Sequence, residues 1–363
     1  MPKTGAPKGE NAMRMLCLIR HGEVTGGAHR CISRTDLPLS PQGRRQAEAL
    51  SRFLRDHPVS AVFSSPSSRC METAALLEGA PAAVPCEALR EADVGQWENL
   101  TFDEIRARFP EDYRARGEHI GTAAPPGGES FLAAGRRLDA CLRELLSSTQ
   151  GDLAIVSHGG VIRGFLCLAL GLSPDEVFSL RQPRGGMSTV AFDGEAFRVL
   201  SVGCKPESFP GDEEIRQLLA RCATPEPVIA HSRAVAKKAL SLAACAPEPV
   251  DWAMLRAACL LHDLCRAQGR GHAEKAASLL DAQGYPELAR VVSQHHDLHS
   301  GAGAEAELLY LADKLIRGCE DVPLETRFEA SRTKCASPEA QAAWSRRYAD
   351  ARRLAQKYRM KED

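Results

Sequence analysis

Two short apolar runs in this chain each end in a histidine. Residues 15–19 lead into Arg20 and His21, and residues 153–156 lead into Ser157 and His158, with glycine following each histidine. Open α/β sheets place their chemistry in this way, in loops at the carboxyl ends of buried strands. The pattern therefore predicts two buried strands that each deliver a histidine to a polar turn.

Strand-like and helix-like patterns alternate from residue 13 to residue 203. Ser40 before Pro41 and Thr101 before Glu104 are typical helix starts. The alternation predicts an α/β domain, with a mostly parallel sheet and helices on both faces. The expected strands are 15–19, 60–63, 153–156, 188–192 and 197–201, and the expected helices are 41–56, 67–77, 101–108, 129–147 and 160–170.

Beyond Asp212 the pattern is helical almost without interruption, which predicts an all-α second domain. The expected helices are 212–222, 226–243, 251–264, 272–283, 286–296, 304–318 and 337–358. We expect a flexible tail at 1–12, an N-terminal domain at 13–203, a Pro- and Gly-containing linker at 204–212, a helical domain at 213–336 and a C-terminal helix and tail at 337–363. The last helix is expected to pack on one of the domains or to mediate oligomerisation.

Composition narrows the classes of partner. A length of 363 residues favours about two domains. The net charge of -1 leaves no basic footprint for nucleic acid, and no apolar run approaches the ~18 residues of a membrane span. The 13 cysteines are odd in number and form no C-x-x-C pair, which favours free thiols and a cytoplasmic location. We expect small phosphorylated molecules as partners and neither nucleic acid nor membrane, and the oligomeric state stays open.

The residues around His21 suit phosphate-ester hydrolysis through a phosphohistidine. This chemistry needs an unprotonated nucleophile, positive donors around the phosphoryl oxygens and an acid for the leaving group. His21 offers a ring nitrogen as the nucleophile, and Arg20 offers a planar fork for phosphate oxygens. Arg69, at the start of a predicted helix, adds an anion site, and His158 adds a further polar contact.

Four motifs occur in an order that resembles the histidine phosphatase superfamily, which has the phosphoglycerate-mutase-like fold. They are Leu18 to Glu23, Ser64 to Ala74, Leu89 to Glu98 and Val156 to Gly160. The resemblance implies that His21 is the phosphorylated nucleophile and that Glu91 is the proton donor. It implies a phosphate pocket of Arg20, Arg69 and His158, next to Gly159, and no cofactor.

Some positions depart from this family pattern. Family members often carry a Thr after Glu23 and an Asn a few residues later, whereas residues 24–29 of this chain read Val-Thr-Gly-Gly-Ala-His. Asn99 stands where a glycine usually follows Trp-Glu. Arg30 is a candidate substrate contact on this side of the pocket. Residues 36–40 and 126–130 are similar to the α-ribazole phosphatase and phosphoglycerate-mutase branch. Glu98 and Glu104 are nearby carboxylates that compete with Glu91 for the role of acid.

A second set of candidate functional residues lies in the segment from His231 to His299, which contains six of the 11 histidines. A carboxylate beside an imidazole, as in His262-Asp263, is costly to bury without a partner. A divalent cation supplies that partner, and mixed His/Asp ligation suits a transition metal such as Fe or Mn. The candidate ligands are His231, His262, Asp263, His272, His295, His296 and Asp313.

This spacing resembles the HD metal-dependent phosphohydrolase superfamily. The resemblance implies that His231, the His262-Asp263 doublet and Asp313 bind one metal. It implies that His272 with His295 or His296 are additional ligands of members that hold two metals. Residues 308–314 are similar to a bacterial branch that hydrolyses diadenosine tetraphosphate to ADP, and Arg266 replaces a lysine that often follows the doublet.

We therefore expect a two-domain phosphohydrolase. The N-terminal domain would hydrolyse a small phosphomonoester through phosphohistidine, and the C-terminal domain would be a metal-dependent phosphohydrolase of nucleotide or dinucleoside polyphosphate type. One alternative is a single α-ribazole-phosphatase-like activity with a non-catalytic, nucleotide-sensing HD module. Another is a phosphotransferase of the phosphoglycerate-mutase type, which the compact spacing between Glu91 and His158 disfavours. The intact set of polar residues around His21 argues against an inactive scaffold.

Overall fold

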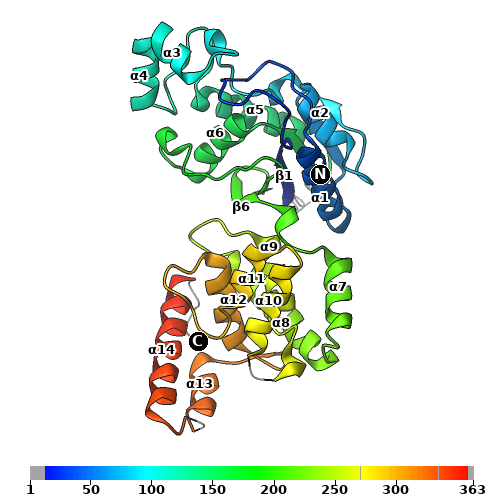
Figure 1. Cartoon of the computed structure of the whole chain (residues 1–363), viewed down its shortest axis with the longest axis vertical. Coiled ribbons are helices and arrows are strands. Elements are labelled where there is room, and N and C mark those ends of the chain that lie inside the picture. The colour runs from blue at the N-terminus through cyan, green and yellow to red at the C-terminus, as the bar shows by residue number, and fades with distance from the viewer. Residues whose placement is uncertain (1–12, 270, 334, 359–363) are drawn as a thin grey trace, which may run out of the picture. The chain divides into compact units, whose positions relative to one another are not determined.

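The computed structural model describes residues 13–269, 271–333 and 335–358. The chain divides into two compact units, one ending at Gly203 and the other beginning at Cys204. Figure 1 colours the first unit from blue to green and the second from green to red.

The N-terminal unit is built on a six-stranded sheet with the order β3-β2-β4-β1-β5-β6. Strands β1, β4, β2 and β3 are parallel neighbours, and β5 runs antiparallel to β1. The strands are β1 (Arg14–Arg20), β2 (Ala61–Ser64), β3 (Val84–Pro85), β4 (Leu153–Ser157), β5 (Met187–Phe192) and β6 (Phe197–Cys204). The predicted mostly parallel α/β fold is confirmed.

Side chains of β1 alternate between two apolar clusters, so the sheet is covered on both faces. Leu16 and Leu18 pack in the cluster that includes Phe165 of α6, whereas Cys17 and Ile19 pack in the cluster that includes Leu50 of α1. The helices of this unit are α1 (Pro41–Asp56), α2 (Ser68–Ala75), α3 (Phe102–Arg108), α4 (Pro110–Glu118), α5 (Phe131–Ser148) and α6 (Gly159–Leu170). The sequence pattern did not predict α4.

The second unit is helical, as predicted, apart from a short hairpin of β7 (Ile316–Arg317) and β8 (Glu320–Asp321). Its helices are α7 (Asp212–Arg221), α8 (Glu226–Ala243), α9 (Trp252–Leu261), α10 (His272–Ala282), α11 (Pro286–Val292), α12 (Ala304–Leu315), α13 (Leu324–Arg332) and α14 (Pro338–Lys357). Helix α14 packs against α12 and α13 of this unit. Of the helices in the described part of the chain, none combines the length and apolar character that crossing a membrane requires.

Three helices of this unit end at least three residues earlier than the pattern predicted, and two of them, α9 and α11, are followed by a histidine. The expected helix 251–264 stops at Leu261, and the expected helix 286–296 stops at Val292. In both cases a histidine just past the helix donates its Nδ1–H to a carbonyl of the last turn, His262 to Cys259 and His295 to Val292, each at 2.8 Å. The helix ends therefore orient two of the candidate metal ligands.

Candidate active sites

The register of β1 and β4 brings His21 and His158 together. Arg20 pairs with Ser157 across the two parallel strands, and the backbone N–H of His21 donates to the carbonyl of Ser157 at 3.0 Å. The two imidazole rings lie edge to face with their centroids 5.2 Å apart. Both rings are buried, so two segments far apart in sequence form one polar centre at the carboxyl edge of the sheet.

The hydrogen bonds of His21 fix its tautomer. Its Nδ1 lies 2.7 Å from the carbonyl oxygen of Gly22, which only accepts, so Nδ1 carries the proton and Nε2 carries the lone pair. Burial, together with the positive charge of Arg69, lowers the pKa of His21 well below its usual value. The ring is therefore neutral and nucleophilic at neutral pH.

The hydrogen bonds of His158 hold its ring in the neutral form, with the proton on Nε2. Arg69 donates from Nε to Nδ1 of His158 at 3.3 Å, so the proton lies on Nε2, which is 2.8 Å from the Ser65 hydroxyl. Burial and the proximity of His21 lower the pKa of His158 well below its usual value. The terminal nitrogens of Arg69 donate to the carbonyls of Thr35 and Ser33, which fixes the guanidinium beside the two rings.

Arg20 reaches this centre because Gly159 has no side chain. A Cβ at Gly159 would lie 2.8 Å from Nε and 2.9 Å from Cζ of Arg20. One terminal nitrogen of Arg20 donates to the carbonyl of Gln182 at 2.7 Å, while its Nε is buried without a hydrogen-bond partner. A buried unpaired donor is costly, and a phosphoryl oxygen would supply the missing acceptor.

The Glu91 carboxylate is held at the N-terminus of α6. Its two oxygens accept from the backbone N–H groups of Gly160 at 3.1 Å, Val161 at 2.9 Å and Ala92 at 2.9 Å. A Cβ at Gly160 would lie 2.7 Å from Oε1. Gly160 therefore leaves room for the Glu91 carboxylate, just as Gly159 leaves room for the Arg20 guanidinium.

The competing carboxylates have other partners. Glu98 accepts from the backbone N–H groups and hydroxyls of Ser33 and Thr35, which ties down the loop that carries them. Glu104 completes the capping box of α3 with Thr101. Neither lines the cavity that contains Glu91, so the geometry favours Glu91 as the acid.

A cavity of about 580 Å³ opens beside Arg20, Glu91 and Gly160. Arg30 also lines it, with one guanidinium nitrogen 2.5 Å from the carbonyl of Asn99. Asn99 adopts a left-handed backbone with φ of 64°, a conformation that glycine adopts most easily and that asparagine tolerates. Asparagine can therefore occupy this position, where the family pattern has glycine.

The second unit gathers the other candidate residues in one cluster. His231 comes from α8, His262 and Asp263 from the end of α9, His272 from the start of α10 and Asp313 from α12. His295 and His296 follow α11. Two groups have ligand atoms that all lie within 4.8 Å of one another, namely His231, His262 and Asp263, and His272, His295 and His296. His299 belongs to neither group.

Several buried atoms in this cluster fit a metal ion. The Nδ1–H groups of His262 and His295 are bonded to backbone carbonyls, so each Nε2 carries a lone pair, and both Nε2 atoms are buried without a hydrogen-bond partner. Burial lowers the pKa of His295 to about 2 and that of His296 to about 4, which keeps the rings neutral. Neutral imidazoles with free, converging Nε2 atoms are the form that binds transition metals.

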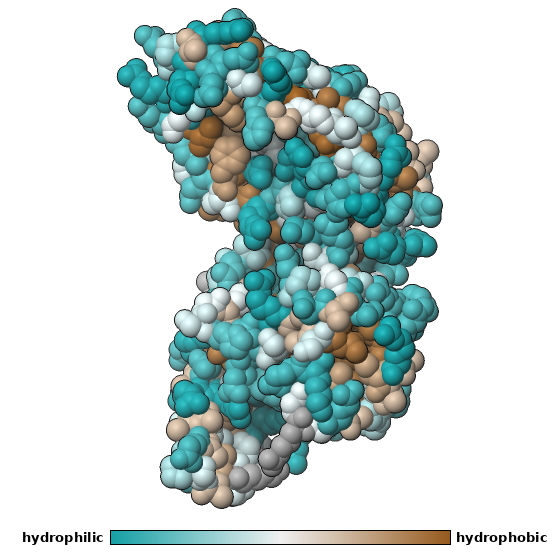
Figure 2. All heavy atoms as spheres, viewed as in Figure 1, coloured by the Kyte–Doolittle hydropathy of each residue, from teal (hydrophilic) through white to brown (hydrophobic). Residues whose placement is uncertain are grey.

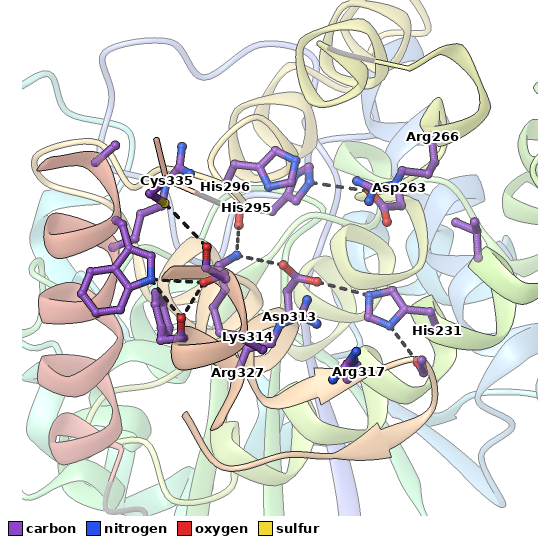
Figure 3. A pocket seen from close by; sticks show the side chains of 18 of the residues that line it. His231, Asp263, Arg266, His295, His296, Asp313, Lys314, Arg317, Arg327 and Cys335 are labelled. Atoms are coloured by element: carbon purple, nitrogen blue, oxygen red, sulfur yellow. Dashed lines mark hydrogen bonds and ion pairs between the residues drawn. The ribbon is translucent and has the colours of Figure 1, made fainter. Parts of the chain in front are cut away.

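A carboxylate lies next to a histidine of each group, Asp313 next to His231 and Asp263 next to His272. Nε2 of His231 lies 3.2 Å from Oδ1 of Asp313, while its Nδ1 is bonded to the carbonyl of Gly318. Nε2 of His272 lies 2.8 Å from Oδ1 of Asp263. Figure 3 shows His231 and Asp313 facing each other, with Lys314 on the other side of the carboxylate. Lys314 donates to Oδ2 of Asp313 at 2.8 Å.

A cavity of about 820 Å³ lies over this cluster and is rich in positive charge. Besides Lys314 it is lined by Arg266, Arg317, Arg327 and Arg347. Arg266 lies 3.1 Å from Nε2 of His272. Helices α13 and α14 supply part of the wall, including the indole of Trp344, whose N–H donates to the carbonyl of Phe328 at 3.0 Å. The wall residues from α13 and α14 could not be predicted, because nothing in their local sequence pattern indicates which cavity they line.

Comparison with known proteins identifies both units. The histidine phosphatase superfamily (branch 1) matches residues 16–205. The chain belongs to the histidine phosphatase superfamily. A second family, the HD domain, matches residues 228–318, so the predicted fusion of these two domains is confirmed.

Curated relatives are similar to about half of this chain. The 6-phosphofructo-2-kinase/fructose-2,6-bisphosphatase of Gallus gallus is 34% identical over 175 residues, which are 47% of this chain and 36% of that protein. The human form 1 of this enzyme is 32% identical over 200 residues, which are 54% of this chain and 39% of that protein. The chain spans less than two fifths of the length of these curated relatives.

Two solved structures each resemble about half of this chain. The α-ribazole phosphatase of Shigella flexneri is 25% identical with a TM-score of 0.48, covering 53% of this chain and 96% of that one. YhfR of Bacillus stearothermophilus is 28% identical with a TM-score of 0.48, covering 51% of this chain and 95% of that one. Superfamily membership identifies the N-terminal unit as a domain of the histidine phosphatase superfamily.

Proposed function

We propose that the N-terminal unit hydrolyses a small-molecule phosphomonoester through a phosphohistidine at His21. Nε2 of His21 attacks phosphorus and forms an N–P bond while the ester P–O bond breaks, and Glu91 gives its proton to the departing alcohol oxygen. Water then attacks the phosphorus, Glu91 takes a proton from it, and inorganic phosphate leaves. The observation that carries this proposal is the neutral, buried His21 with its Nε2 lone pair free beside two guanidinium groups.

Rapid-quench labelling tests this half of the proposal. With a ³²P-labelled alkyl phosphate, the wild type is expected to form an acid-labile, base-stable phosphoenzyme that decays to inorganic phosphate in water. His21→Ala is expected to form none. Label on another residue would refute the role of His21, and a phosphoenzyme that transfers only to a phosphorylated acceptor would indicate the mutase alternative.

We propose that the helical unit is a second, metal-dependent phosphohydrolase centre. His231, His262, Asp263 and Asp313 would hold one transition-metal ion, and His272, His295 and His296 would hold a second. When bound, the metal would polarise a phosphoryl group and lower the pKa of water. The unpaired buried Nε2 atoms of His262 and His295 are the observation that supports it, and Arg317 and Arg327 would neutralise the phosphates.

The positive cavity and the indole of Trp344 support a substrate with several phosphates and an aromatic base, a nucleotide or dinucleoside polyphosphate. Metal analysis and hydrolysis of diadenosine tetraphosphate test this, with His262→Ala compared with His299→Ala as a matched control outside both ligand groups. Metal and activity lost together only in His262→Ala would support an enzyme. Metal without any hydrolysis would favour the nucleotide-sensing alternative.

The cysteines support a reducing compartment, and we propose the cytoplasm. None of the 13 cysteines, all of which lie in the described part of the chain, forms a disulfide, although Sγ of Cys86 lies 3.6 Å from Sγ of Cys141. Counting thiols with and without reductant in freshly lysed cells tests the proposal. Thirteen reactive thiols under denaturing conditions are expected, and a disulfide already present in the cell would contradict it.

A further inference from the structure

The cavity beside Glu91 has aromatic walls. Trp97, Tyr113 and Phe131 line its interior, and they come from the turn before α3, from α4 and from the start of α5. The guanidinium of Arg116 lies 4.7 Å from the centroid of the Phe131 ring and 5.9 Å from that of Trp97. Arg116 therefore packs against two of these rings, and the centroids of the Trp97 and Tyr113 rings lie 6.4 Å apart.

Two further phenylalanines line the same cavity from exposed positions. Phe102 at the start of α3 is 55% exposed and Phe178 is 58% exposed. They are the two exposed phenylalanines among the described residues. Apolar side chains beneath the α3–α4 pair are visible at the surface in Figure 2. Exposed aromatic rings that converge on one cavity indicate a binding surface rather than chance exposure.

The cavity is larger than a short polar leaving group requires. Its volume of about 580 Å³ falls in the range of pockets that enclose drug-sized ligands. A three-carbon alcohol would leave most of the aromatic wall in contact with water. A planar ring would fill the space and stack on it.

Most of the charged side chains that line the cavity are already hydrogen-bonded. Glu91 is the one acidic residue of the described lining, and Arg30, Arg116 and Arg163 each donate to a backbone carbonyl, which leaves Arg20 for the phosphoryl group. Arg116 donates to the carbonyl of Ala123, and Arg163 donates to the carbonyl of Leu180 at 2.9 Å while lying 5.5 Å from the ring centroid of Phe178. No described carboxylate apart from Glu91 lines the wall to recognise the hydroxyls of a sugar or polyol.

We propose that the phosphatase unit is selective for phosphomonoesters whose alcohol carries a planar aromatic ring, and that Phe102 and Phe178 determine this selectivity. The proposal rests on the function proposed for His21. With phosphorus at His21 and the ester oxygen at Glu91, the leaving group would extend into the aromatic cavity.

The test compares 2-naphthylmethyl phosphate with glycerol 3-phosphate, both esters of primary alcohols, so that differences in leaving-group acidity are small. The wild type is expected to have a kcat/KM at least tenfold higher on the naphthyl ester. Phe102→Ala and Phe178→Ala are each expected to lower the ratio of the two kcat/KM values by about three- to tenfold, the contribution of one aromatic contact. Val84→Ala removes an exposed apolar side chain that does not line the cavity and is the matched control.

The outcomes separate the two proposals. A wild-type ratio near or below one, or ratios unchanged in both phenylalanine variants, would overturn the aromatic selectivity while leaving the phosphatase intact. Absence of hydrolysis of both esters by the folded wild type would overturn the function proposed for His21 as well. Because both phenylalanines are more than half exposed, their replacement is expected to leave the fold unchanged, and circular dichroism checks this.

Discussion

Glu91→Gln separates the proposed acid from its structural surroundings. Glutamine keeps the shape of the side chain but has no proton to give and only one accepting oxygen. In the wild type, Oε1 of Glu91 accepts from the backbone N–H groups of Ala92 and Val161, and Oε2 accepts from that of Gly160 at 3.1 Å. If the glutamine oxygen takes the Oε1 position, its amide nitrogen takes the Oε2 position and faces the N–H of Gly160. One buried N–H loses its acceptor, which is expected to reduce stability by about 1–3 kcal/mol.

The effect on rate is expected to depend on the leaving group. Proton donation by a positioned acid contributes roughly 10²- to 10⁴-fold, so transfer from benzyl phosphate to His21 should slow by that factor. A dinitrophenolate leaves without a proton, so transfer from 2,4-dinitrophenyl phosphate should slow less than about tenfold. The pre-steady-state burst of released alcohol or phenol measures this transfer alone.

Glu104→Gln is the matched control for this substitution. Glutamine also completes a capping box, so α3 should keep its start and both bursts should match the wild type. Equal slowing of the two esters in Glu91→Gln would refute the role of Glu91 as acid. A leaving-group dependence that appears in Glu104→Gln instead would transfer that role to the competing carboxylate.

Three other perturbations follow from single contacts. Gly159→Ala should displace the Arg20 guanidinium, because the added Cβ would lie 2.8 Å from its Nε. The kcat/KM on benzyl phosphate should fall by roughly 10- to 100-fold, which is the contribution of one hydrogen bond to a charged group. An unchanged kcat/KM would contradict the placement of Arg20. Burial lowers the pKa values of His21 and His158 in the folded state, so the unfolded chain binds more protons below pH 6.5. The free energy of unfolding measured in urea should therefore fall by up to about 1.4 kcal/mol per pH unit for each ring as the pH drops. The slope should be smaller in His158→Gln, and a slope equal to that of the wild type would contradict the lowered pKa of His158. Glu307→Gln should lower the free energy of unfolding of the helical unit by about 2 kcal/mol, since the buried carboxylate accepts hydrogen bonds from Lys357 and Tyr358 at 2.7 and 2.9 Å. An unchanged midpoint of denaturant unfolding would show that the packing of α14 does not depend on this carboxylate.

The parts of the fold that the sequence predicts are those set by local periodicity. The apolar runs before His21 and His158 form the neighbouring strands β1 and β4, and the structure places the two histidines in contact because the strands are parallel and in register. The caps at Ser40 and Thr101 begin helices where expected. The helix ends at Leu261 and Val292 were not predicted, since the histidine hydrogen bonds that accompany them do not change the apolar pattern.

The walls of the two cavities could not be predicted in the same way. Helix α4 follows α3 directly and carries Tyr113 and Arg116 into the phosphatase cavity, and α14 carries Trp344 into the cavity over the metal-ligand candidates. These placements depend on tertiary packing, whereas short sequence motifs mark the candidate catalytic histidines. The sequence therefore indicates the chemistry of each centre, and the structure is needed to infer what lies around it.

The most direct test of two independent centres measures bound metal and two activities on one preparation, before and after chelation. Wild type, His21→Ala and His262→Ala are compared on benzyl phosphate and on diadenosine tetraphosphate. The account predicts that chelator and His262→Ala abolish only the metal-dependent hydrolysis of the dinucleotide, while His21→Ala abolishes only the hydrolysis of benzyl phosphate. Loss of benzyl phosphate hydrolysis on chelation, with retention of that activity in His21→Ala, would contradict the account, because the metal centre would then perform both reactions.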